Sequence, residues 1–176
     1  MIADTDLLTL TAGRWLAPIM ALLDEAGGAR FAAMLGTLGL SRSALAASLA
    51  QLQALGWVAR NPGHGHPLRP EYVLTGTGRP IAAFARRVMA ERGKLGLEKG
   101  TLSRWSLPVV ARLGHDPARF TQLRDALWPV TPRALSLTLK QLLQIDLIDR
   151  ALEDEFPPIA IYGLTGRGRD LAAALR

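Results

Sequence analysis

The chain has 176 residues, of which 49% are hydrophobic, and its formal net charge is +6 at pH 7. The apolar content excludes a disordered chain, and the absence of cysteine excludes a disulfide, a thiol nucleophile and a cysteine–zinc site. No apolar run reaches the roughly 18 residues that span a bilayer, and Asp4 and Asp6 stand where a signal peptide carries basic charge, so we expect a cytoplasmic protein with no membrane contact.

Three helices are expected in the first 55 residues. Apolar residues recur at helical spacing over residues 7–26, and Gly27-Gly28 ends this stretch. Residues 29–38 predict a second, short helix that is followed by a tight turn. Ser41 is a typical N-cap for a third helix reaching about Leu55. The leucines of this third helix recur at i, i+4, i+7 and i+10, which predicts one continuous apolar stripe made of Leu45, Leu49, Leu52 and Leu55.

A hairpin and a fourth helix are expected next. Residues 57–60 and 71–74 predict two strands, and the loop between them is rich in glycine and proline. Thr75 or Thr77 can cap a last helix that runs to about Arg92. A short helix joined by a tight turn to a capped amphipathic helix is a helix-turn-helix arrangement, and the hairpin after it is the wing of a winged helix.

The second half of the chain repeats the first. The segment Tyr72-Val-Leu-Thr-Gly-Thr-Gly-Arg79 returns as Tyr162-Gly-Leu-Thr-Gly-Arg-Gly-Arg169, an offset of 90 residues. Further matches at an offset of 89 or 90 are Trp15 with Trp105, Arg30-Phe31 with Arg119-Phe120, Leu49 with Leu139, and Arg60 with Arg150. The chain is therefore two copies of one structural unit, and we expect the units to comprise residues 1–95 and 96–176.

The second copy predicts the same elements in the same order. They are a main helix from Ser103 or Ser106, a short helix over 120–127, a third helix from Thr131 with the stripe Leu135, Leu139, Leu142 and Ile145, hairpin strands over 147–150 and 159–164, and a last helix over 166–176. The predicted fold is mainly α with small β-hairpins: two tandem winged helix-turn-helix units that form a pseudo-dimer within one chain.

Four short motifs stand out along the chain: Arg14-Trp15 at the main helix, Arg30-Phe31 at the short helix, Gly56-Trp-Val-x-Arg60, and the repeated Tyr-x-Leu-Thr-x-x-Gly-Arg. Together they resemble the HxlR-type winged-helix regulators, a bacterial branch near the MarR-type proteins. Such proteins usually have one unit and dimerise to read two half-sites. The resemblance therefore implies a fused pseudo-dimer that binds double-stranded DNA as a monomer or a weak homodimer. Many of them carry a cysteine before the first helix, and its absence here excludes a thiol switch.

The third helix of a helix-turn-helix enters the major groove of DNA with its N-terminal part. The candidate contacts that face away from the leucine stripe are Arg42, Ser43 and Ala46 in the first copy and Arg133, Ser136 and Lys140 in the second. Arginine can make the bidentate contact with guanine, and lysine can neutralise a phosphate. The first wing adds Arg60, His64, His66 and Arg69. All these residue types are also common on solvated surfaces, so plain surface positions stay an alternative.

The basic charge is shared evenly, with +3 in residues 1–90 and +3 in residues 91–176, and it favours a polyanionic partner. The leading hypothesis is a DNA-binding transcriptional regulator that uses both units on an imperfect palindrome. The alternative is a degenerate winged-helix module that binds proteins with little or no DNA binding. The alanine-rich outward face at residues 46, 47 and 50, the acidic second wing at 151–158 and outward-facing Leu137 favour this alternative.

An enzyme is not expected. The sequence has no glycine-rich phosphate loop, nucleophile elbow, metal signature or obvious carboxylate pair, so no catalytic residue, cofactor or metal is predicted. A small-molecule effector between the two halves is compatible with a regulator, but no residue of the sequence identifies such a ligand.

Overall fold

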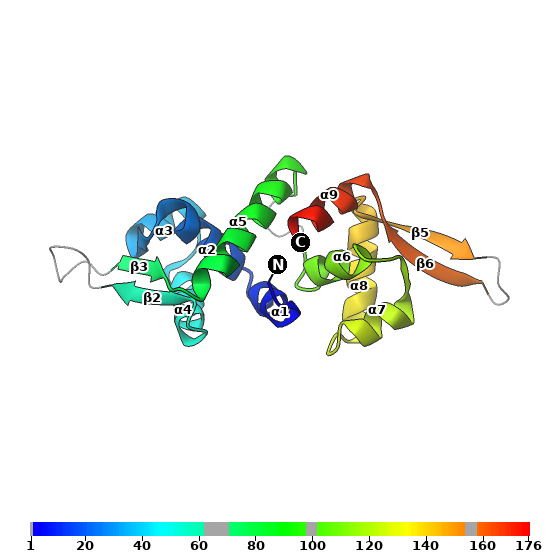
Figure 1. Cartoon of the computed structure of the whole chain (residues 1–176), viewed down its shortest axis with the longest axis horizontal. Coiled ribbons are helices and arrows are strands. Elements are labelled where there is room, and N and C mark those ends of the chain that lie inside the picture. The colour runs from blue at the N-terminus through cyan, green and yellow to red at the C-terminus, as the bar shows by residue number, and fades with distance from the viewer. Residues whose placement is uncertain (1, 62–70, 98–101, 154–157) are drawn as a thin grey trace. The chain divides into compact units, whose positions relative to one another are not determined.

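The computed structural model describes residues 2–61, 71–97, 102–153 and 158–176 (Figure 1). The chain divides into two compact units. We call residues 9–90 the N-unit, and residues 91–176 together with residues 3–8 the C-unit. The division falls within the first helix and within the long helix that follows the first wing.

The first winged helix has the predicted order of elements. Along the chain these are α1 (Asp4–Ala12), α2 (Leu16–Ala26), β1 (Ala29–Arg30), α3 (Phe31–Leu38), α4 (Arg42–Ala54), β2 (Val58–Asn61), β3 (Glu71–Leu74) and α5 (Gly78–Lys94). The apolar stretch over 7–26 forms two helices, because the chain breaks around Gly13 between α1 and α2. No single helix among the described residues is long and apolar enough to cross a membrane, and only the bent pair α1 and α2 reaches that length and composition jointly.

The second winged helix repeats this order from α2 onward. Its elements are α6 (Ser106–Leu113), β4 (Ala118–Arg119), α7 (Phe120–Ala126), α8 (Pro132–Gln144), β5 (Ile148–Glu153), β6 (Ile159–Leu164) and α9 (Gly166–Ala174). The main helix begins at Ser106, one of its two predicted starts, and α8 begins directly after its predicted cap, Thr131. The tandem winged-helix fold expected from the sequence is therefore confirmed.

Each wing belongs to a three-stranded antiparallel sheet, in the orders β1-β3-β2 and β4-β6-β5. Tyr72 of β3 lies opposite both Ala29 of β1 and Arg60 of β2. Tyr162 of β6 has the equivalent place, opposite Ala118 and Arg150. The prediction that helix begins at residue 29 was wrong, because Ala29 and Arg30 pair with the wing before α3 begins at Phe31.

The leucine stripes form the cores below α4 and α8. Leu45, Leu49 and Leu52 are buried, and so are their counterparts Leu135, Leu139 and Leu142. The predicted fourth member of the first stripe departs from this pattern, because Leu55 is the C-cap of α4 and is 38% exposed. Burial of each stripe turns the opposite helix face outward, where the candidate DNA contacts lie.

A Thr–Gly junction closes the first wing, and it explains the repeated sequence motif. The Thr75 hydroxyl donates to the carbonyl oxygen of Gly56 at 2.6 Å and accepts from the Gly78 N–H at 3.0 Å. A Cβ on Gly78 would lie 1.9 Å from the carbonyl oxygen of Trp57, so only glycine fits there. The junction thus joins the end of α4, the root of the wing and the start of α5.

The second copy has the same Thr–Gly junction. The Thr165 hydroxyl donates to the carbonyl oxygen of Asp146 at 2.8 Å and accepts from the Gly168 N–H at 3.1 Å. A Cβ on Gly168 would lie 1.9 Å from the carbonyl oxygen of Leu147. Asp146 replaces Gly56 in the left-handed position after the helix, with a φ of 56°, a conformation that aspartate tolerates better than most side chains.

Replacing Gly78 with alanine should destabilise the fold by about 3 kcal/mol, because the added methyl group overlaps a backbone carbonyl that cannot move without opening the wing. Gly76→Ala is the matched control, since a Cβ there meets no atom within 4 Å. Urea unfolding of the two variants measures the difference. Equal stability of the two variants would contradict the role assigned to the Thr–Gly junction.

Candidate nucleic-acid interface

The first helix-turn-helix consists of α3, a short turn and α4. Gly39 ends α3 in the left-handed conformation, with a φ of 62°, and its N–H donates to the Leu35 carbonyl oxygen at 3.0 Å. Ser41 then caps α4, because its hydroxyl accepts from the Ala44 N–H at 3.2 Å. The glycine and the serine together set the direction in which α4 leaves the turn.

The second helix-turn-helix has a cap of the same kind. The Thr131 hydroxyl accepts from the Ala134 N–H at 3.2 Å, and Pro132 occupies the first position of α8. A hydroxyl contact also holds α8 against the segment before α6, since Oγ1 of the buried Thr138 lies 3.1 Å from Ser103 Oγ. At the equivalent place in α4, the Ser48 hydroxyl instead donates to the Ala44 carbonyl oxygen of its own helix.

The outward face of α4 carries the predicted residues Arg42, Ser43 and Ala46, and all three are exposed. The Ser43 hydroxyl lies 3.1 Å from the hydroxyl of the cap residue Ser41, at the start of the helix. The second and third turns expose Ala46, Ala47 and Ala50, and the last turn exposes Gln51, Gln53 and Ala54. Arg42 is thus the one cationic side chain of α4 that can contact DNA bound at this face.

The outward face of α8 differs from that of α4. The predicted residues Arg133, Ser136 and Lys140 are all exposed, and Leu137, which lies among them, is 60% exposed. Two cations, a hydroxyl and an apolar side chain therefore share this face. Guanidinium and ammonium groups suit phosphates and guanine edges, and apolar groups suit the methyl group of thymine.

The wing residues are only partly described. Arg60 is exposed on β2, and its guanidinium carbon lies 6.0 Å from the centre of the Tyr72 ring on the neighbouring strand. His64, His66 and Arg69 lie outside the described residues. In the second wing, Arg150 is the exposed counterpart of Arg60, and the acidic residues 154 and 155 again lie outside the described part of the chain.

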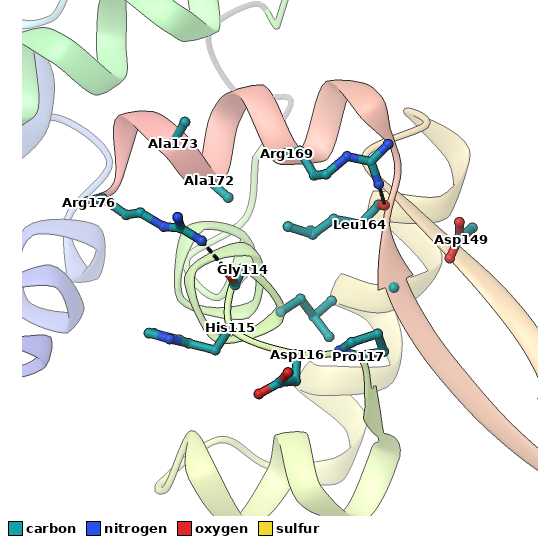
Figure 2. Close-up of a pocket in the computed structure, with 12 residues that line it drawn as sticks. Gly114, His115, Asp116, Pro117, Asp149, Leu164, Arg169, Ala172, Ala173 and Arg176 are labelled. Carbon is teal, nitrogen blue, oxygen red and sulfur yellow. Dashed lines mark hydrogen bonds between the residues drawn. The ribbon is translucent and has the colours of Figure 1, made fainter.

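Each unit also has an open hollow beside its last helix, which the sequence did not predict. Leu23, Arg79 and Ala83 line the hollow of the N-unit, which has a volume of about 640 Å³. Their repeat counterparts Leu113, Arg169 and Ala173 line the hollow of the C-unit, of about 490 Å³ (Figure 2). The sequence repeat pairs these lining residues, because the members of each pair differ by 90 in residue number.

The arginines that line the hollow of the C-unit contact the protein itself. Figure 2 shows Arg169 donating to the Leu164 carbonyl oxygen at 2.8 Å and Arg176 donating to the Gly114 carbonyl oxygen at 2.6 Å. In the N-unit, the counterpart of Arg176 is Arg86, which forms a 2.6 Å ion pair with Asp24. Because Arg169, Arg176 and Arg86 bond to the protein itself, we assign them a structural role in positioning the last helix of each unit. The outward faces of the two helix-turn-helix segments therefore remain the candidate interface.

A large aromatic side chain also lies beside the second helix-turn-helix. Trp128, in the segment between α7 and α8, is 81% exposed. By contrast Trp57 is buried, and Trp15 and Trp105 are half-buried under the guanidinium groups of neighbouring arginines.

Comparison with known proteins adds sequence evidence to this geometry. The family model described as HxlR-like helix-turn-helix matches residues 10–99 and again residues 101–176. An uncharacterized HTH-type transcriptional regulator from Synechocystis is 37% identical over 73 residues, which cover 42% of this chain and 54% of that protein. The chain thus spans about half the length of this curated relative.

Two solved structures are similar over about half of the chain. One is described as a putative transcriptional regulator of the MarR family from Enterococcus faecalis, with 26% identity, a TM-score of 0.41, and coverage of 50% of this chain and 74% of that chain. The other is the reduced form of the transcriptional regulator YodB from B. subtilis, with 22% identity, a TM-score of 0.39, and coverage of 57% and 83% respectively.

The cap of α8 and its exposed face should respond differently to mutation. Thr131→Ala should cost about 1 kcal/mol of stability, because the Ala134 N–H loses its acceptor. Ser136→Ala should stay within about 0.5 kcal/mol of the parent protein, since this side chain is exposed. Chemical denaturation separates the two cases, and a larger loss for Ser136→Ala would show that the outward face of α8 is a structural contact.

Proposed function

The chain belongs to the HxlR-like helix-turn-helix family, and on this premise we propose that it is a DNA-binding transcriptional regulator whose two units act together on one DNA duplex. The functional units are residues 1–95 and 96–176, each with its own recognition helix and wing. One chain then supplies what two subunits supply in a dimeric regulator, so it acts as a monomeric pseudo-dimer or a weak homodimer. It acts in the cytoplasm, where its DNA is accessible.

The observation that carries this proposal is the pair of capped, amphipathic helices α4 and α8, each with an exposed face that includes arginine. A helix of this kind reads base edges when its N-terminal residues enter the major groove. Arg42 and Arg133 stand in the first turn of their helices, where they reach guanine O6 and N7. Two such helices bind one duplex when they enter major grooves about 34 Å apart.

The contacts divide into base reading and charge neutralisation. Ser43, Ala46 and Ser136 line the groove beside the two arginines, while Lys140 and Arg60 neutralise phosphates. His64, His66 and Arg69, in the loop of the first wing, add contacts to the backbone or the minor groove. Because the faces of α4 and α8 differ, the preferred DNA site is an imperfect palindrome.

A protein-binding module is the second candidate, and the exposed apolar side chains of the C-unit favour it. Trp128 is 81% exposed, Leu137 60% and Leu152 61%. Exposed apolar side chains grouped in one patch mark protein interfaces more often than scattered ones do. These three lie on different elements of the unit, before α8, on α8 and on β5. The net charge of +6 favours DNA over an apolar partner.

Fluorescence anisotropy with the gene's own upstream DNA tests the proposal. At about 50 mM salt the chain should bind, and its affinity should fall linearly on a log–log plot as salt rises. The double variant Arg42→Ala/Arg133→Ala should lose at least about 30-fold of its preference for this DNA over a scrambled duplex, because two guanine contacts of about 1–3 kcal/mol each are removed. No binding at low salt would exclude the DNA proposal and leave the protein-binding module.

Lys94→Ala is the control for loss of charge. Lys94 lies at the end of α5, outside both helix-turn-helix segments, and its ammonium group is 2.9 Å from Glu91. This hydrogen bond raises the pKa of Lys94, so the residue keeps its charge at neutral pH. The control should leave the preference for the upstream DNA within about twofold, since non-specific charge acts equally on both duplexes.

A further inference from the structure

We infer that the two units read DNA unequally: α8 specifies more of the base sequence than α4, and Leu137 is a specificity determinant of its half-site. The inference rests on the proposed DNA-binding function and concerns how that function is divided between the units. It follows from a position-by-position comparison of two helices that share a scaffold but differ on their outward faces.

The scaffold of the two helices is matched. Both α4 and α8 have 13 residues, and both begin after a hydroxyl cap, Ser41 or Thr131, that accepts from the N–H three residues later. Their buried leucines correspond at an offset of 90. Each outward position of α4 therefore has one counterpart on α8, and the difference between the helices lies in the side chains alone.

In the N-terminal part of α4, functional groups are confined to the first turn. Arg42 and Ser43 lie in this turn, and the next exposed positions are Ala46, Ala47 and Ala50. The exposed glutamines Gln51 and Gln53 lie in the last turn of the helix, beyond the N-terminal part that enters the groove. A methyl group neither donates nor accepts a hydrogen bond, so these three alanines allow close approach to the groove without distinguishing most bases. The N-terminal part of α4 therefore reads little beyond the base that meets Arg42.

The counterparts of those alanines on α8 are Ser136, Leu137 and Lys140. From Arg133 to Lys140 the helix rises about 10 Å, or two turns. The stretch of α8 that offers charged, polar or bulky apolar groups is therefore about twice as long as the first turn of α4, which holds Arg42 and Ser43. Arg133, Leu137 and Lys140 stand at i, i+4 and i+7, and these positions share one side of a helix. A guanidinium, an isobutyl group and an ammonium thus follow one another along the exposed face.

The two flanking cations indicate what covers Leu137, which is 60% exposed. An apolar protein partner would have to strip water from Arg133 and Lys140, and that desolvation is unfavourable unless the partner supplies anions. The major groove satisfies all three side chains, because phosphates line its edges and the methyl group of thymine projects into it. Charge complementarity therefore favours thymine as the group that Leu137 contacts.

The two arginines also differ in position. Arg42 is the first residue of α4, whereas the first residue of α8 is Pro132 and its arginine follows at 133. One helical position turns a side chain by about 100° and moves it about 1.5 Å along the axis. The guanine that Arg42 contacts and the guanine that Arg133 contacts are therefore not related by the twofold symmetry of a perfect palindrome.

Selection of DNA sites by the full chain from a random duplex library tests the inference. We expect one half-site with both a constrained guanine and a constrained thymine, and a second half-site with a single, weaker guanine preference. Arg133→Ala should weaken the preference for guanine in the first half-site by about 5- to 150-fold. Leu137→Ala should weaken the preference for thymine in the same half-site by about 3- to 10-fold. This is the expected effect of removing one or two buried methyl or methylene groups from the contact.

Ala47→Leu is the reciprocal variant, because it gives α4 the side chain that α8 has at the equivalent position. It should create a new thymine preference in the weaker half-site. Both residues are exposed, so thermal unfolding should be unchanged in either variant. Selected sites with equally constrained halves, or a thymine preference that survives Leu137→Ala, would overturn the inference while leaving DNA binding intact. Failure to select any site would instead remove the proposed function.

Discussion

The winged-helix geometry of each unit depends on one close contact, the Thr–Gly junction. In the first copy a single carbonyl group, that of Trp57, accepts from the Thr75 N–H at 3.1 Å and from the Thr75 hydroxyl at 3.2 Å, and it also excludes any side chain at Gly78. The end of the recognition helix, the root of the wing and the start of the last helix meet at this point. The wing consequently keeps a fixed direction relative to the helix that it flanks.

Duplication has preserved this junction while the outward faces have diverged. The repeated motif Tyr-x-Leu-Thr-x-x-Gly-Arg places threonine and glycine at 75 and 78 and again at 165 and 168. Its tyrosine occupies the middle strand of each sheet. By contrast, three alanines on α4 correspond to serine, leucine and lysine on α8. Residues that hold the fold are thus constrained by contact with backbone, whereas exposed residues are free to specialise because their replacement costs little stability.

Much of the fold could be predicted because its signals are local. Hydroxyl caps such as Ser41 and Thr131 depend only on nearby residues, as do the leucine stripes, and the structure confirms the caps and the first three leucines of each stripe. The strands at Ala29–Arg30 and Ala118–Arg119 could not be predicted, because two residues show no alternation and pair only once the wing has formed. The outward direction of the candidate site residues follows from helical periodicity, but their contacts with DNA depend on a partner and remain a proposal.

The central claim is that one chain presents two recognition helices to a single duplex. Hydroxyl-radical footprinting at one chain per duplex tests it most directly, because it maps each protected stretch of backbone. Two protected stretches with centres about 10 base pairs apart, the spacing of successive major grooves, are the predicted result. One protected stretch at this stoichiometry, with the second appearing only when another chain binds, would contradict the claim.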